Sequence, residues 1–403
     1  MPKTGWLIST IVVLLAIYLR LPQPSMDWTS IETNARSFAG NDFHEGPYPL
    51  QGVTAVVTGA TSGIGLALTN RLAGMGATVI ALGRSQRKLD GVVKQYQQQQ
   101  QQQEESASGG VTVLGSIETV VVELSNLVSV RQAADTILTK YQSIDILVNN
   151  AGIHYANGFS LQKSPVSPDG AFDLSFAVNY LSHVLLTEKL LSALRNSHVK
   201  TPTVLQVSSS FHWAADGSEL MPQKDGTAPL AAQPQGLQSV WRDQRAYTNS
   251  KLAQILHGRA LAHRETGTVR FVSICPAWVA TQIGGNKWSV PYWIMRFLAF
   301  PSTEFGLASS MAALFDGENR QNDFVANTPM SNASGKLPSF LFEAWAYRYG
   351  VRDLFAIGFA MSLIVFQKLF PAAQAMLSSP ESYDDEIRDA LFEWSLKAVE
   401  PFL

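Results

Sequence analysis

Residues Thr54–Gly65 read TAVVTGATSGIG, and this stretch decides the fold. The opening run of β-branched and apolar residues is typical of a buried strand, and the glycines that follow suit a tight turn and a close approach of helix to strand. A helix is predicted from about Ile64 to Met75, with Gly76 as its C-terminal cap. The backbone N–H groups at the start of such a helix, with the positive end of its dipole, favour a bound pyrophosphate. The alternative is a glycine turn that only connects two elements.

Five more apolar runs follow this turn, each short enough to be a strand. They are Thr78–Leu82, Thr119–Val122, Ile144–Val148, Thr203–Val207 and Val269–Ile274. Amphipathic stretches separate them, from Gln86 onward and over Val130–Tyr141, Phe172–Leu194 and Arg245–Arg264. This alternation predicts an α/β fold: a Rossmann-type doubly wound parallel sheet that binds its ligand at the carboxyl ends of the strands.

Composition narrows the function. The 403 residues are 46% hydrophobic, and 30 Lys and Arg stand against 32 Asp and Glu. Nucleic-acid binding normally needs a basic excess, so we expect no nucleic-acid partner. Cys275 is the only cysteine, which excludes an internal disulfide, and the seven histidines show no metal-ligand spacing, so we expect no metal.

The N-terminal stretch is apolar on every face. Thr4–Leu19 carries no charge and lies between Lys3 and Arg20. A bilayer span needs about 17–25 residues, so the stretch is of marginal length. It lacks the small residues of a signal-peptide cleavage site and the polar face of a core helix. We therefore predict an uncleaved membrane anchor over residues 1–21, followed by a proline-punctuated linker over residues 22–51.

One catalytic domain is predicted over residues 52–327, with a C-terminal extension over residues 328–403. Gln97–Gln103 is a run of glutamines, which we interpret as a solvated loop insertion, with a partner-binding tract as the alternative. In the extension, Leu337–Tyr349 and Leu354–Phe370 are aromatic and apolar. A helix lying on the membrane, a second anchor and a dimer surface all remain open for the second of these.

Two patterns carry chemistry. Tyr247 and Lys251 stand four residues apart, which on a helix places both side chains on one face. Arg84 follows the second strand, where dinucleotide-binding folds read the adenosine ribose. Gly83 leaves no acid to accept from the ribose hydroxyls of NAD, and the Arg84 guanidinium suits a 2′-phosphate. We therefore predict NADP(H); a solvated basic start to the next helix is the alternative.

The ordered motifs resemble the short-chain dehydrogenase/reductase superfamily. Thr58–Gly65 is similar to its T-G-x-x-x-G-[IL]-G motif, Asn149–Gly152 to N-N-A-G, and Tyr247–Lys251 to Y-x-x-x-K. Asn179 matches the helix asparagine of its catalytic tetrad, and Ser209 its catalytic serine. The helix sequence around Tyr247, the S-x-x-H pattern of Ser209–His212 and the tail around Trp394 are closest to the retinol-dehydrogenase-like group.

The resemblance implies a set of site residues. The catalytic residues would be Asn179, Ser209, Tyr247 and Lys251. The cofactor-binding residues would be Gly59, Thr61, Ser62, Gly63, Ile64, Gly65, Arg84, Glu123, Leu124, Asn150, Ala151, Gly152, Tyr247, Lys251, Pro276, Val279 and Thr281. Tyr247 would exchange the proton, with its pKa lowered by Lys251, which would also hold the nicotinamide ribose. Ser209 would polarise the substrate oxygen, and Asn179 would hold a water of the proton relay.

The chain departs from the family pattern in three places. Glu123 stands where an aspartate usually follows the third strand, and Ala277 replaces the usual glycine after Pro276. Between Ser209 and Tyr247 the chain is about two dozen residues longer than in minimal family members, a comparison that rests on the resemblance alone. We expect this insertion, Phe211–Gln244, to loop out above the site.

The substrate is predicted from the aromatic segment Gly284–Pro301, which in the family covers the substrate. An apolar lid indicates an apolar substrate, although the segment could instead pack on the sheet or membrane. The sequence thus predicts an NADP(H)-dependent oxidoreductase for a lipophilic alcohol or carbonyl, which could be retinoid-like, a steroid or another lipid. The alternative is an idle NADP-binding scaffold. The membrane, most simply the endoplasmic reticulum, is the expected partner, and a homodimer stays open.

Overall fold

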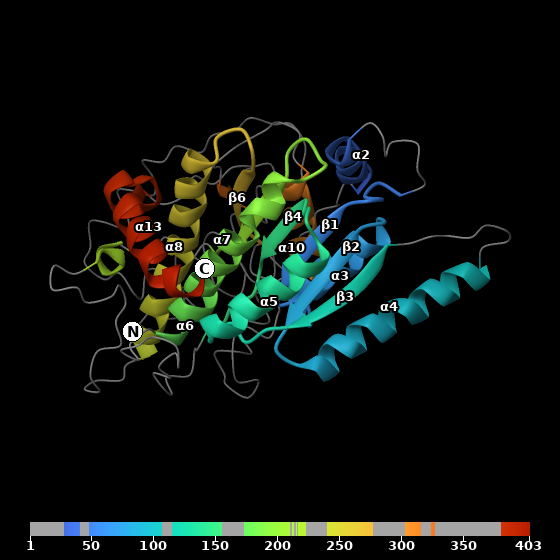
Figure 1. The fold of residues 1–403 in the computed structure, drawn as a ribbon, viewed down its shortest axis with the longest axis horizontal. Coiled ribbons are helices and arrows are strands. Elements are labelled where there is room, and N and C mark those ends of the chain that lie inside the picture. Colours follow the sequence, from blue (N-terminus) through green and yellow to red (C-terminus); the bar gives the residue numbers. More distant parts are fainter. Residues whose placement is uncertain are drawn as a thin grey trace, which may run out of the picture.

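The computed structural model describes residues 28–40, 48–106, 115–154, 173–209, 212, 215, 217–222, 240–276, 303–315, 324–326 and 380–403. Seven strands form one parallel sheet in the order β3-β2-β1-β4-β5-β6-β7 (Figure 1). They are β1 Thr54–Thr58, β2 Thr78–Gly83, β3 Ser116–Val121, β4 Ile146–Asn149, β5 Thr203–Val207, β6 Arg270–Cys275 and β7 Phe324–Ala326. The strand order reverses between β1 and β4, which confirms the doubly wound sheet. Open sheets of this class bind their ligands at such a switch point.

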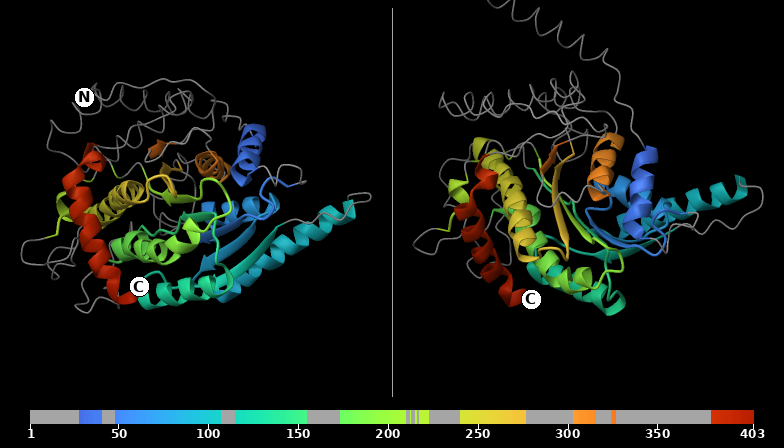
Figure 2. Two further views of the ribbon diagram at one scale, coloured as in Figure 1. Left: turned by 45° about the horizontal axis from the view of Figure 1, so that its top comes forward. Right: turned by 90° about the horizontal axis from the view of Figure 1, so that it is seen from above.

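Both faces of the central strands are buried because those strands are apolar on both sides. Val56 of β1 belongs to one hydrophobic cluster, whereas its neighbours Ala55 and Val57 belong to the other. The first cluster includes residues of α5 (Leu127–Lys140), α7 (Ser182–Arg195) and α8 (Val240–Arg264), and the second those of α3 (Gly63–Gly74), α4 (Gln86–Ser106) and α10 (Glu304–Leu314). Figure 2 shows these helices flanking the sheet.

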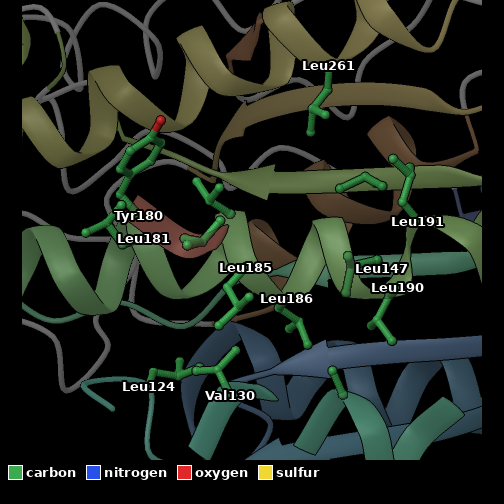
Figure 3. Packing of buried hydrophobic residues seen from close by; sticks show 14 of the residues in the cluster. Leu124, Val130, Leu147, Tyr180, Leu181, Leu185, Leu186, Leu190, Leu191 and Leu261 are labelled. Atoms are coloured by element: carbon green, nitrogen blue, oxygen red, sulfur yellow. The ribbon is translucent and has the colours of Figure 1, made fainter. Parts of the chain in front are cut away.

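Leucines of α7 fill the core beneath the switch point. Leu185, Leu186 and Leu190 are fully buried and lie beside Val130 of α5 and Leu147 of β4 (Figure 3). Truncating a buried leucine of this kind to alanine typically costs about 2–5 kcal/mol of stability. This packing gives the strand ends a rigid base on which the site is built.

The glutamine run is helical, so the loop prediction is wrong there. Gln97–Gln103 lies within α4, which extends beyond the edge of the sheet (Figure 1). Tyr96 is buried, and its hydroxyl donates to the carbonyl of Gly115 at 3.3 Å, while Gln100 Nε2 donates to the same carbonyl at 3.2 Å. Glutamine is a good helix former, and these two anchors hold the last turns although most of the other glutamines are exposed.

Part of the predicted linker is also structured. Helix α2 spans Trp28–Ala39 and buries Ile31, Ala35 and Ala39, which recur every four residues on one face. Arg71 of α3 pairs with Glu32 at 2.7 Å, and its guanidinium lies 4.5 Å from the centre of the Trp28 ring. The apolar face of α2 is short and lies in a polar segment flanked by prolines, which is why the sequence pattern predicted a linker.

The end of the chain packs on the catalytic domain. Helix α13 (Asp385–Val399) lies along α8, between short 3₁₀ turns at Pro380–Tyr383 and Glu400–Phe402 (Figure 1). Leu391 and Val399 join the cluster that also contains α7. The remainder of the predicted extension, residues 328–379, lies outside the described residues.

The predicted anchor, residues 1–21, lies outside the described residues as well. In the part of the chain that the structure describes, no helix combines the length and the apolar character that crossing a bilayer requires.

Candidate active site

Thr58, the last residue of β1, ties the glycine turn to the N-N-A-G motif. Its hydroxyl accepts the backbone N–H groups of Asn150 and Ala151, both at 2.9 Å, and lies 3.1 Å from His183 Nε2. Asn150 Nδ2 donates to the Thr58 carbonyl at 2.8 Å. These bonds hold the carboxyl ends of β1 and β4 together at the switch point.

At two positions of the turn, Gly59 and Gly65, there is no room for a side chain. A Cβ at Gly65 would lie 2.4 Å from both the Gly59 carbonyl oxygen and Asn150 Nδ2. Gly59 has φ +68°, and a Cβ there would lie 3.0 Å from the same amide. The turn therefore folds back tightly on Asn150, which brings the N-terminus of α3 against the strand ends.

The N-terminus of α3 fits an anionic ligand. Ser62 is the N-cap residue in extended conformation, and its side chain makes no capping hydrogen bond. The first backbone N–H groups of the helix are thus not bonded by that side chain, and the helix dipole favours an anion there. Thr61, Gly63 and Ile64 lie in or beside this turn as the sequence predicted.

Residues after the second and third strands have contrasting surroundings. Arg84 is exposed directly after β2, where its side chain can reach a ligand bound at the carboxyl ends of the strands. Glu123 is half-buried, and its Oε1 accepts from Ser125 N at 3.1 Å and Ser125 Oγ at 2.8 Å. Leu124 is buried in the core. The Glu123 carboxylate, a predicted cofactor-binding group, is therefore engaged by the next turn of its own chain.

Asn179 is fully buried in a π-helical turn, Ala177–Leu181, between α6 (Leu174–Phe176) and α7. Its Oδ1 accepts from Ile153 N at 2.8 Å, and its Nδ2 donates to Ile153 O at 3.1 Å and Ser250 Oγ at 3.0 Å. It thus fastens the loop after β4 to the helix that carries the Y-x-x-x-K motif. A π turn is a frequent feature of functional sites.

Tyr247 and Lys251 lie together on α8, as their spacing predicted. Lys251 Nζ is 5.6 Å from the centre of the Tyr247 ring and donates to the Val207 carbonyl at 2.9 Å. Gly152 lies between Lys251 and Asn179, since a Cβ there would be 3.4 Å from Nζ and 3.5 Å from Asn179 Oδ1. Ser209, just after β5, hydrogen-bonds Tyr247. All four residues of the predicted catalytic set therefore meet at one place.

Burial dominates the electrostatics of this pair. Desolvation raises the pKa of Tyr247 above its ordinary value, more than the hydrogen bond from Ser209 lowers it. Desolvation also lowers the pKa of Lys251 to about 7. The sequence predicted that Lys251 would lower the pKa of Tyr247, but in this structure the loss of water around the almost fully enclosed Tyr247 side chain is the largest influence and raises its pKa.

Three predicted residues follow the sixth strand. Pro276 is buried directly after β6. Strand β6 is the neighbour of β5, the strand whose Val207 carbonyl accepts from Lys251. Val279 and Thr281 lie outside the described residues, as do the aromatic segment Gly284–Pro301 and most of the insertion Phe211–Gln244. His212 is buried, with Nδ1 2.6 Å from the Ser209 carbonyl, which explains the S-x-x-H pattern as a local brace.

Sequence reasoning missed several residues of the site. Thr58 was read only as part of the glycine motif, although it is the centre of the hydrogen bonds at the switch point. His154 stacks on Tyr247 with ring centres 4.3 Å apart, and Gln254 accepts from Lys251 Nζ at 3.0 Å. For Gln254 the sequence did offer one indication of this contact, its i to i+3 spacing from Lys251 on a helix. Nothing local marked His154.

Comparison with known proteins identifies the family. The short chain dehydrogenase model matches residues 53–214. An oxidoreductase of Schizosaccharomyces pombe of uncharacterized activity is 32% identical over 259 residues, 64% of this chain and 67% of that protein. The chain belongs to the short-chain dehydrogenase/reductase superfamily and is close to its retinol-dehydrogenase-like group.

Two human relatives give the group. Retinol dehydrogenase 14 is 30% identical over 240 residues, 59% of this chain and 65% of that protein, just under two thirds of its length. Retinol dehydrogenase 13 is 27% identical over 290 residues, 66% of this chain and 77% of that protein. Among solved structures, an uncharacterized protein from Mycobacterium paratuberculosis matches with a TM-score of 0.54 at 22% identity, over 87% of this chain and 94% of that one, which shows the fold.

Members of this superfamily are oxidoreductases that use a nicotinamide cofactor. The chain fits such a group on its own structure: the cradle at Gly59 and Gly65 has no room for a side chain, and the Ser62 side chain does not cap α3. Both features suit a pyrophosphate that approaches the backbone closely.

Proposed function

We propose that this chain is an NADP(H)-dependent oxidoreductase that interconverts a lipophilic alcohol and its aldehyde or ketone. The observation that carries the proposal is the meeting of Tyr247, Lys251, Ser209 and Asn179 beside the glycine turn. The retinol-dehydrogenase-like relatives support a lipophilic alcohol as the substrate class, with steroid and other lipids as variants of it.

In the proposed reaction the bound cofactor supplies or accepts the hydride. Tyr247 donates its phenolic proton to the carbonyl oxygen during reduction and takes it back during oxidation. Ser209 donates a hydrogen bond to the same oxygen and polarises it. Lys251 holds positive charge beside the phenolate that Tyr247 becomes, which offsets the pKa rise that burial causes.

Arg84 supports NADP(H) over NAD(H). Its guanidinium is exposed at the end of β2, where the adenosine ribose lies in dinucleotide folds, and Gly83 offers no carboxylate to a ribose hydroxyl. A planar guanidinium binds a phosphate through two parallel hydrogen bonds.

Purified protein, NADPH and a panel of lipophilic aldehydes and ketones test this function. We expect NADPH oxidation with at least one member of the panel, and loss of that oxidation in Tyr247→Phe. NADPH binding without turnover on any member would favour the scaffold alternative. Turnover by Tyr247→Phe within about threefold of wild type would contradict the role of Tyr247, since a placed acid contributes about 10²-fold or more.

We further propose that Thr4–Leu19 anchors the protein in a membrane, most simply the endoplasmic reticulum. The support is that this stretch is uncharged and apolar on every face, and a lipophilic substrate is concentrated in a bilayer. Full-length protein should stay with membranes in alkaline carbonate, and a Leu14→Arg/Leu15→Arg variant should be released. Release of the wild type would exclude the anchor.

A further inference from the structure

Gln254 contacts the ammonium of Lys251, which lies about one turn earlier on the same helix α8. Lys251 Nζ donates to the Val207 carbonyl at 2.9 Å and to Gln254 Oε1 at 3.0 Å. Val207 contributes a backbone group, so Gln254 provides the partner that a substitution can alter. We propose that Gln254 is a positioning residue that fixes the Lys251 ammonium beside Tyr247 and extends the pH range over which it stays protonated. This inference rests on the proposed function, in which Lys251 acts on Tyr247.

The chemistry of the amide defines which atom faces the lysine. An ammonium has three N–H donors and no lone pair, so only the amide oxygen of Gln254 can bond it. Gln254 and Lys251 are 1% and 2% exposed, so this bond forms away from water. A hydrogen bond between a charge and a polar group is stronger in that setting, and it also costs more to remove.

Lys251 needs such a partner because burial works against its charge. Desolvation lowers the pKa of Lys251 to about 7, and the nearby Cys275 at the end of β6 partly opposes this. His183 on α7 also interacts with Lys251, but its own pKa is lowered to about 3 by burial, so it is neutral. Tyr247 faces Lys251 on α8 itself. Among the described residues, no carboxylate contributes to the pKa shift of Lys251.

Two carbonyl oxygens therefore provide the negative ends of the dipoles that contact the ammonium. Replacing one of them with an apolar group should release the proton at lower pH, whereas replacing it with a carboxylate should retain the proton to higher pH. The two replacements should therefore shift the pH of proton loss from Lys251 in opposite directions. A packing defect would shift it in the same direction in both variants, so the comparison separates an electrostatic role from a purely steric one.

The layer under Lys251 also offers a matched control. Gln206 on β5 is fully buried and faces α8 at Gly258, one turn beyond Gln254, where a Cβ would lie 3.9 Å from Gln206 Cγ. Its two amide atoms have no hydrogen-bond partner among the described residues. Gln206→Met thus replaces a buried amide of the same size in the same layer without removing a bond to Lys251.

The test compares wild type with Gln254→Met, Gln254→Glu and Gln206→Met. Two readouts are measured across pH: kcat/KM for NADPH-dependent reduction, and the dissociation constant of NADPH by calorimetry. Loss of a hydrogen bond to a charged group corresponds to a shift of about one pH unit or more. We expect the alkaline fall in both readouts to move down by that amount in Gln254→Met, up in Gln254→Glu, and not at all in Gln206→Met.

Unchanged profiles in both Gln254 variants, or shifts in the same direction, would overturn the inference. If Gln254→Met does not fold, the upward shift in Gln254→Glu alone carries it, and no shift there overturns it. If wild-type protein reduces none of the substrates, the proposed function fails, while the pH dependence of NADPH binding still decides whether Gln254 controls the protonation of Lys251.

Discussion

The two halves of the site are built in different ways. The glycine turn at Thr58–Gly65 is short and uses mainly backbone atoms. It meets the ends of two neighbouring strands, at Asn150 after β4 and at Leu82 of β2, whose carbonyl accepts from Ala60 N at 3.1 Å. The half around Tyr247 and Lys251 uses side chains from a π turn, from the segment just after β5 and from α8, together with the Val207 carbonyl of β5. Steric limits determine the structure of the first half, whereas burial and charge determine the properties of the second. Substitutions in the two halves should therefore have different effects.

The C-terminal helix belongs to the second half. Tyr180, next to Asn179 in the π turn, hydrogen-bonds Ser395 of α13 at 2.9 Å, and the rings of Tyr180 and Phe392 both lie 5.9 Å from His257 of α8. A segment more than two hundred residues away along the chain thus supports the turn that carries Asn179.

The largest expected effect separates chemistry from cofactor binding. Tyr247→Phe should lower turnover by at least about 10²-fold, because the proton donor is removed. NADPH affinity should stay nearly unchanged, because the glycine turn is intact. Steady-state kinetics and calorimetry on the same preparation provide the two numbers. A parallel loss of affinity would mean that the halves are not independent.

Arg84→Ala should act on the first half only. We expect NADPH binding to weaken by about 1.5–3 kcal/mol, the range for a hydrogen bond to a charged group, while NADH binding barely changes. Lys94→Ala, an exposed cation further along α4, is the control and should leave both affinities alone. Equal losses for NADPH and NADH would show that Arg84 does not read the 2′-phosphate.

Gly65→Ala tests whether space shapes the first half. Its added Cβ would sit 2.4 Å from backbone and from Asn150, so the turn must shift, at a cost of about 1–3 kcal/mol in stability and with weaker NADPH binding. Gly74→Ala, at the other end of the same helix, meets nothing within 4 Å among the described residues and should be neutral or stabilising. Urea unfolding of both variants measures the contrast.

Burial of Lys251 should make stability depend on pH. Its pKa of about 7 in the folded chain lies below the ordinary 10.5, so between these values the unfolded chain binds more protons and stability rises with pH. Relative to Lys251→Met, wild type should gain about 1 kcal/mol per pH unit in this window. Unfolding at several pH values measures this gain, and Lys94→Met should show no such dependence. A flat difference would mean that Lys251 stays charged when folded.

The smallest effect concerns the distant support. Tyr180→Phe removes the hydrogen bond to Ser395 and should cost about 1 kcal/mol of stability. A double-mutant cycle with Ser395→Ala isolates the pair. Turnover should fall modestly while NADPH affinity holds, because only the half that contains Asn179 is supported this way. An equal fall in NADPH affinity would contradict the division of the site.

Much of the fold and part of the site could be predicted from the sequence. The apolar runs specified the strands, and six of the seven observed strands, with their parallel order, were predicted from them. The glycine turn and the pairing of Tyr247 with Lys251 were legible because turns and helix faces depend on residues close in the chain. The three-residue β7 was too short to stand out.

Tertiary structure alone decided the rest. The helicity of the glutamine run depended on anchors at Gly115, and the packing of α2 and α13 depended on partners far away in the chain. The pKa of Tyr247 moved against the sequence-based expectation, and that of Lys251 was lowered, because desolvation is set by everything that surrounds a group. Thr58 acquired its role for the same reason: its partners Asn150 and Ala151 are brought to it by the fold, and residue spacing does not encode such distant contacts.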